Sequence, residues 1–202
     1  MFQEKVRLYR FRNQVRMLGK AQSMMKEAGL DPHEVPLRVL LPLLEGASIE
    51  EEESLVDRWA ALLANAAADG ACRVPPSFPK ILGQLDSPDV VILEVLHKNY
   101  LVDSERSEED RTEEEARLIE EGKHVPWGTT LEKLHHEACL VTLDTIQLSL
   151  DNLMGLGLVD RNPLLRVFQS DNVVFTPKAE YRLTSLGVRF VTTCSPPNSC
   201  GS

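Results

Sequence analysis

Two histidines, one glutamate and one cysteine near residue 135 come closest to a chemical site. Glu132 and His136 are four residues apart, and so are His135 and Cys139. That spacing places two side chains on one face of a helix, but the two pairs point in different directions. A zinc site needs three or four converging ligands. We therefore interpret the histidines as a surface pair and expect no metal site.

Other catalytic signatures are missing from the sequence. It contains no P-loop, no G-x-S-x-G nucleophile elbow and no G-x-G-x-x-G dinucleotide motif. The four glutamates at 50–53 are explained by the positive dipole end of a helix start. The sequence therefore predicts a protein that is not an enzyme and binds no cofactor. An enzyme of unrecognised type remains an open alternative.

The histidines fall within residues 87–191, where we expect the order helix, helix, helix, strand, wing, strand. The segments LGLVD and YRLTSLGVRFV resemble the ends of winged helix-turn-helix domains. The predicted fold class is therefore mainly α. It has an N-terminal helical region at 1–86, followed by a winged helix-turn-helix-like α+β domain at 87–191.

An acidic run interrupts this second domain. Residues 103–121 contain ten acidic and three basic side chains, a net charge of −7. We expect an insertion at 103–124 that is a solvated helix or a mobile excursion. The alternative is an acidic partner surface, or a clamp for the basic N-terminal helix of the same or another copy. Residues 192–202 are expected to be a disordered tail.

The predicted reading helix is poorly suited to DNA. Between Glu137 and Asp160 there is no Lys or Arg, whereas Asp144 and Asp151 would repel phosphates. A modest contact from the wing is conceivable through its cations, which are Arg161, Arg166, Lys178 and Arg182. Because of the negative charge of the reading helix, we expect this domain to contact proteins rather than to read DNA. A winged-helix fold allows either role, since a fold does not fix a function.

Residues 36–70 predict a helical hairpin that organises the N-terminal region. Gly46 is expected to end the first helix, and Ser48 with Glu51 to form a capping box for the second. Gly70 stands where a C-terminal cap belongs. Apolar residues recur along both helices at helical spacing: Leu37, Leu40, Leu41, Leu44, Ile49, Val56, Trp59, Leu62, Leu63 and Ala66.

Three residues of this hairpin are candidates for contacts with a partner. Trp59 is expected in the core, with a role as an interface anchor as the alternative. Asn65 is a poor helix former late in an alanine-rich helix, so we expect it to bond a neighbouring turn or a partner. Glu45 is the third candidate.

Residues 2–28 predict one long helix with an apolar stripe at alternating spacings of three and four. The stripe consists of Leu8, Phe11, Val15, Leu18 and Met25, with Gln22 interrupting it between the last two. We expect it to pack on the 36–70 hairpin. A homodimer contact is a second interpretation, because three heptads are marginal alone and require a partner. A nucleic-acid or membrane-surface helix is a third.

Composition limits the partners. The chain has 202 residues and a net charge of −9, which argues against broad nucleic-acid binding and against anionic membranes. The charge is uneven, since residues 1–30 carry +5 and the rest carry −14. No apolar run could span a bilayer, and the N-terminus lacks the apolar core of a signal peptide.

Cysteine usage favours a reducing compartment. The four cysteines form no C-x-x-C pair. We therefore expect free thiols and a cytoplasmic location. A disulfide between Cys194 and Cys200 is the alternative.

Several segments resemble the Abi-alpha family of bacterial proteins. The specific part is PLLEGASIEEEESLVDRWAALLANAA (42–67), followed by SPDVVILEVL (87–96). The basic segment at 10–32 is similar to the lead-in of those proteins, and the resemblance covers roughly residues 5–190. It implies a cytoplasmic role in abortive infection, a defence in which an infected cell stops growing. It implies no catalytic residue.

The leading hypothesis is a non-enzymatic bacterial anti-phage protein that acts through protein–protein interaction. Its partner would be a phage protein, a host protein or a second copy of the chain. The alternative is a winged-helix transcription regulator that binds DNA through the basic N-terminal helix and the wing.

Overall fold

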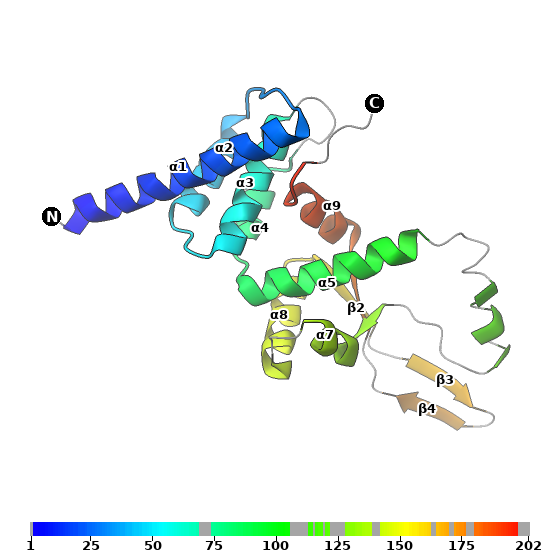
Figure 1. Ribbon diagram of the computed structural model, residues 1–202. Coiled ribbons are helices and arrows are strands. Elements are labelled where there is room, and N and C mark those ends of the chain that lie inside the picture. Colours follow the sequence, from blue (N-terminus) through cyan, green and yellow to red (C-terminus); the bar gives the residue numbers. More distant parts are fainter. Residues whose placement is uncertain are drawn as a thin grey trace. The chain divides into compact units, whose positions relative to one another are not determined.

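The computed structural model of this chain is mainly helical, with a small antiparallel sheet (Figure 1). It describes residues 2–68, 74–105, 113–114, 116–118, 120–121, 128–138, 142–162, 165–169, 172–176 and 180–197. For 162, 165–169 and 172–176 it describes the backbone alone. Within these ranges, no helix is both long enough and apolar enough to cross a membrane.

Two compact units divide the chain. Unit 1 combines Met1–Val90 with Arg189–Ser202, and unit 2 is Val91–Val188. The sequence assigned 87–191 to a single domain, whereas the last helix, α9 (Ser185–Thr193), contributes residues to both units. The predicted tail at 192–202 begins inside this helix, and Cys194 just beyond it is buried.

Unit 1 is built on the long helix α1 (Phe2–Ala28), as the sequence predicts. The helix closes at Gly29, whose φ of +68° lies in the left-handed region that favours glycine. It packs against α2 (Leu37–Ser48) and α3 (Glu53–Ala67). Figure 1 shows its N-terminal turns extending beyond both helices, and residues 2–12 are all exposed.

Trp59 fixes the contact between α2 and α3. Its side chain is buried and lies directly against Gly46, where an added Cβ would be 2.6 Å from Trp59 Cζ2. Gly46 does not end the first helix as predicted, because α2 continues through it to Ser48. The glycine is required by packing, since the indole ring leaves no room for a side chain.

The start of α3 also differs from the prediction. Ser48 and Glu51 were expected to form a capping box, but Ser48 is the last residue of α2 and its hydroxyl donates to a carbonyl of that helix (2.7 Å). The helix begins at Glu53. Just before it, Glu50 Oε1 accepts the backbone N–H groups of Glu51 (2.9 Å) and Glu52 (3.0 Å). Glu50 therefore accepts the Glu51 N–H that the capping box assigned to Ser48, and the Glu52 N–H as well.

The short helix α4 (Phe78–Leu82) and the end of α9 complete the core of unit 1. The rings of Phe78 and Phe190 meet edge to face, with centroids 5.2 Å apart, an arrangement that aromatic pairs prefer. The predicted cap at Gly70 lies outside the described residues. The largest fully buried side chains of this unit are Met17, Leu43, Trp59, Leu62, Phe78, Leu82 and Phe190.

Unit 2 combines helices with a three-stranded antiparallel sheet of order β1-β5-β2. The strands are β1 (Thr129–Thr130), β2 (Val159–Asn162) and β5 (Glu180–Leu183). The helices are α5 (Ser87–Ser104), which begins in unit 1, α7 (Leu131–Glu137) and α8 (Leu143–Gly155). Leu134, Ile146, Leu150 and Leu153 are fully buried between them and the sheet.

Local signals place these helices where the sequence indicated. Thr142 caps α8, since its hydroxyl oxygen accepts the Thr145 N–H (3.3 Å). Gly187 lets α9 approach β2 closely, because a Cβ there would be 3.0 Å from the Leu158 carbonyl carbon.

Two further strands, β3 (Leu165–Gln169) and β4 (Asn172–Thr176), pair as a hairpin where the wing was predicted. Most of the predicted insertion at 103–124 lies outside the described residues.

The Gly46–Trp59 contact can be tested by adding one methyl group. Gly46→Ala should lower the free energy of unfolding by about 1–3 kcal/mol, because the methyl overpacks against the indole. Gly19→Ala is the matched control: it lies within α1, where a Cβ meets nothing within 4 Å. It should raise stability by up to about 1 kcal/mol. Urea unfolding of both variants measures the effect, and equal stability of the two would contradict the packing.

Candidate interaction surface

The residues first considered for chemistry do not gather into a site. His135 and His136 lie exposed on α7, and Cys139 is outside the described residues. Across the ranges that the structure describes, no three His, Cys, Asp or Glu side chains are placed to hold a metal. The exposed faces of α1 and α8 are the remaining candidates.

Two polar side chains determine which face of α1 points inward, because they hydrogen-bond to backbone carbonyls of α2 and of a residue just after it. Asn13 is buried, and its Nδ2 donates to the carbonyl oxygen of Ser48 (3.2 Å), the last residue of α2, and to that of Glu50 (3.0 Å), two residues beyond the helix. Gln14 Nε2 donates to the Leu44 carbonyl within α2 (3.1 Å). The last carbonyls of a helix have no partner within the helix, so Asn13 supplies the donor that the Ser48 carbonyl requires.

Apolar residues complete this inner face. Met17, Ala21 and Met25 follow Asn13 at spacings of four and are all buried. Residues at this spacing form one line along a helix. The sequence analysis missed this line, although the small Ala21 between two methionines was a usable signal for a closely packed face.

The predicted stripe therefore points away from the hairpin. Leu8, Phe11, Val15 and Leu18 are 69%, 63%, 50% and 44% exposed, while Met25 is buried. The prediction that the stripe packs on 36–70 is wrong. Asn13 hydrogen-bonds to the end of α2 and therefore faces the hairpin, so the opposite face of α1, which carries these four residues, is exposed. We call these four residues the exposed stripe. Monomeric proteins rarely leave such contiguous apolar patches uncovered.

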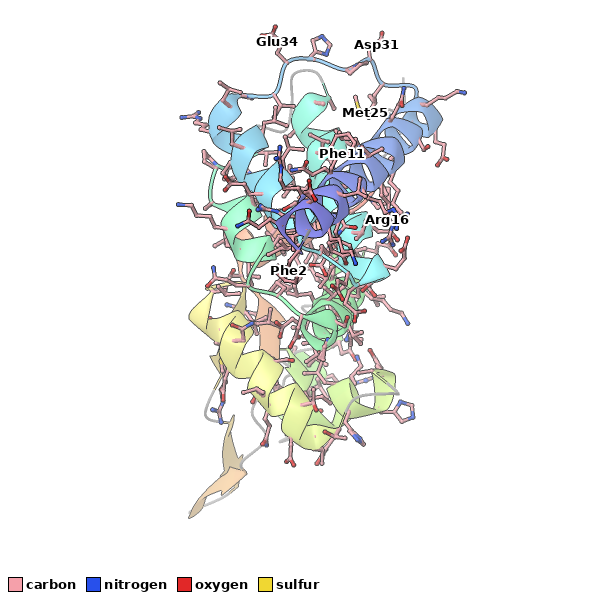
Figure 2. All side chains as sticks on the ribbon, turned by 90° about the vertical axis from the view of Figure 1, so that its left-hand side faces the viewer. Phe2, Phe11, Arg16, Met25, Asp31 and Glu34 are labelled. Atoms are coloured by element: carbon pink, nitrogen blue, oxygen red, sulfur yellow. The ribbon has the colours of Figure 1, made fainter. Side chains whose placement is uncertain are left out.

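The arginines of α1 divide into two groups. Arg10 Nε donates to Ser48 Oγ (2.9 Å), and Arg16 pairs with Glu53 on α3. Figure 2 shows Phe11 and Arg16 on different sides of the helix. In the described part of the chain, Arg7 and Arg12 have no hydrogen-bond or ion-pair partner. These two cations flank the exposed stripe.

A shallow open depression lies on the first turns of the same helix. Its lining residues all belong to α1: Glu4, Arg7, Leu8, Arg10, Phe11 and Gln14. Because it is open and formed by one helix, it suits the side of another polypeptide better than an enclosed small molecule.

The three interaction candidates of the hairpin are not part of the exposed stripe. Trp59 is in the core. Asn65 Nδ2 donates to the carbonyls of Thr193 (2.8 Å) and Ser195 (2.9 Å), and so holds the end of α9. Glu45 is exposed on α2.

Arg58 on α3 also hydrogen-bonds to the end of the α9 segment, at Cys194. Arg58 Nη1 donates to the Cys194 carbonyl (3.2 Å). Cys194 is a free thiol. Burial raises its pKa well above the ordinary value, and the Arg58 charge opposes that rise only in part. A thiol that stays protonated is a poor nucleophile, so its role is packing.

The outer face of α8 is acidic and partly apolar. Asp144, Gln147 and Asp151 are exposed, and Leu148 is 72% exposed. Within unit 2, Arg161 lies over the Tyr181 ring, 5.9 Å from its centroid. The side chains of Arg166 and Lys178 are outside the described residues. Two carboxylates on this face would repel phosphates, whereas the exposed leucine suits a protein contact.

The orientation of α1 can be tested by comparing its two faces. Asn13→Ala should lower the free energy of unfolding by about 1–3 kcal/mol, because the buried Ser48 carbonyl at the end of α2 and the part-buried Glu50 carbonyl beyond it lose their donor. Val15→Ala, on the opposite face, should change it by less than about 0.5 kcal/mol when measured on the monomer at low protein concentration. Urea unfolding followed by circular dichroism measures both. A larger loss for Val15→Ala would show that the stripe is the packed face.

Comparison with known proteins gives one result. The family described as "Abortive infection alpha" matches residues 4–194 of the 202. Searches of curated proteins and of solved structures each gave no match. The matched range includes nearly all of α1, the α2–α3 pair and all of unit 2. The chain therefore belongs to the abortive infection alpha family.

Proposed function

We propose that this protein takes part in abortive infection in bacteria by binding other polypeptides, without a catalytic site of its own. Membership of the abortive infection alpha family supports the defence role. The observation that carries the interaction is the exposed stripe of α1, which lies opposite the face that the protein uses to pack its own core. We place this activity in the bacterial cytoplasm.

We further infer that unit 2 is a winged-helix domain used for protein contacts. The order α5, β1, α7, α8, β2, β3–β4 hairpin, β5 supports this inference, since it matches the order expected from the sequence. In a DNA-reading domain, α8 would carry side chains that bond base edges and cations that meet phosphates. Instead Asp144 and Asp151 flank the exposed Leu148. The charge of this helix gives the transcription-regulator alternative no support.

A plaque assay with surface variants tests this proposal. Bacteria that express the wild-type chain should give at least about tenfold fewer phage plaques than cells with an empty vector. Phe11→Asp should abolish protection, because a charge on the exposed stripe prevents apolar docking. Folding of each variant is checked by its thermal unfolding curve.

The control changes the residues first considered for chemistry. A double variant, His135→Ala with His136→Ala, should protect as well as the wild type. If the histidine variant loses protection while Phe11→Asp keeps it, the protein acts through chemistry at α7 and not through the stripe.

A further inference from the structure

We propose that the exposed stripe is covered by the same stripe of a second copy, with the two α1 helices running antiparallel. This inference rests on the proposed function, because it names the partner of that interaction surface. The inference adds the orientation of the two helices, the register between them and the effect of salt on the dimer.

The register follows from the spacing of the stripe. Leu8 and Val15 lie seven residues apart, and so do Phe11 and Leu18. In an antiparallel pair, positions of the first set face positions of the second. Leu8 then faces Leu18 of the second copy while Phe11 faces Val15, and the two-fold axis repeats both contacts. One alignment therefore buries all eight apolar side chains.

The available area is close to what a stable dimer needs. From their exposed fractions, the four residues offer roughly 450 Å² in each copy, or about 900 Å² in the pair, compared with a total of about 1,200–2,000 Å² for specific interfaces. Flanking side chains add to the apolar area. On the adjacent α2, which the Gln14–Leu44 bond sets beside α1, Leu37 and Leu41 are also exposed.

The projecting start of α1 also fits this arrangement. Residues 2–12 of α1 are all exposed, and they contact the rest of the chain through polar groups, such as the bond from the Tyr9 hydroxyl to Glu51 Oε1 (3.0 Å), whereas the large apolar residues Phe2 and Val6 are 81% and 41% exposed. An isolated helical extension is marginal in water. In the antiparallel pair, these turns run alongside the later turns of α1 in the second copy and gain a neighbour.

Charge works against the pair but does not prevent it. The register brings Arg12 close to Arg12 of the second copy, and this residue has no partner within the described chain. Repulsion between two exposed charges is weak and screened by salt, whereas burial of eight apolar side chains contributes more free energy. The dimer should therefore tighten as salt increases. A dimer held by contact between basic α1 and an acidic surface would weaken instead.

Sedimentation of the purified full chain over a range of protein and salt concentrations tests the proposal. The wild type should be a dimer that dissociates on dilution, with a lower Kd at 500 mM than at 50 mM NaCl. Arg12→Gln should lower the Kd severalfold at 50 mM NaCl, because both copies lose the charge and the like-charge contact is removed. Wild-type protein that stays monomeric at 100 µM, or a dimer weakened by Arg12→Gln, would overturn the proposal.

Two variants locate the interface. Leu18→Asp should raise the Kd at least tenfold, and Leu8→Asp, at a residue that is 69% exposed, should do the same while leaving the fold intact. The matched control is Leu148→Asp, an equally exposed leucine on α8, which should leave the Kd unchanged. A dimer that survives both stripe variants, or dissociates with the control, overturns the assignment.

The outcomes separate this inference from the function proposed above. A monomeric wild type that still protects cells, with protection lost in Phe11→Asp, would mean that a different polypeptide covers the stripe. A dimer with the predicted variant and salt responses but without phage protection would leave the inference standing and remove the proposed function.

Discussion

The hydrogen bonds from α1 to the C-terminal carbonyls of α2 decide which surface this protein presents. The end of a helix has carbonyl groups that need donors, and Asn13 provides one for Ser48, the last residue of α2, while Asn13 also bonds Glu50 just beyond it and Gln14 bonds Leu44. Leaving a buried acceptor unpaired costs about 1–3 kcal/mol, so a rotation of α1 about its axis would be unfavourable. Because Asn13 must face inward, Phe11 and Val15 must face outward. The apolar stripe is exposed for this reason.

The helix therefore has two packing faces with different requirements. The inner face uses a buried amide and a small residue, Ala21, to approach α2 and α3. The outer face carries the four apolar residues of the exposed stripe, flanked by Arg7 and Arg12, which have no hydrogen-bond or ion-pair partner in the part of the chain that the structure describes. Each buried apolar side chain is worth about 1.5–3 kcal/mol, whereas an exposed charge pair is worth at most about 1 kcal/mol. Apolar burial outweighs the charge repulsion, which is why a second stripe is a suitable cover.

Local patterns predicted much of the fold. The boundaries of α1, the cap at Thr142 and the family itself could all be read from the sequence. The inward face of α1 could not, because periodicity finds an apolar line but does not reveal that the end of a neighbouring helix needs donors. Gly46 was misread for a related reason: its role depends on Trp59, thirteen residues away on another helix. In both cases, residues distant in the sequence determine the role of the residue in question.

The most direct test of this account is the distance between spin labels in the two copies of the dimer. Labels are placed through Arg12→Cys or Lys26→Cys, with Cys72, Cys139 and Cys200 changed to serine. An antiparallel pair predicts about 10 Å between labels at position 12 and on the order of 40 Å at position 26, from 1.5 Å of rise per residue. Short distances at both positions would indicate parallel helices, and the absence of any intermolecular distance would show that the stripe does not bind itself. Either result would contradict the account.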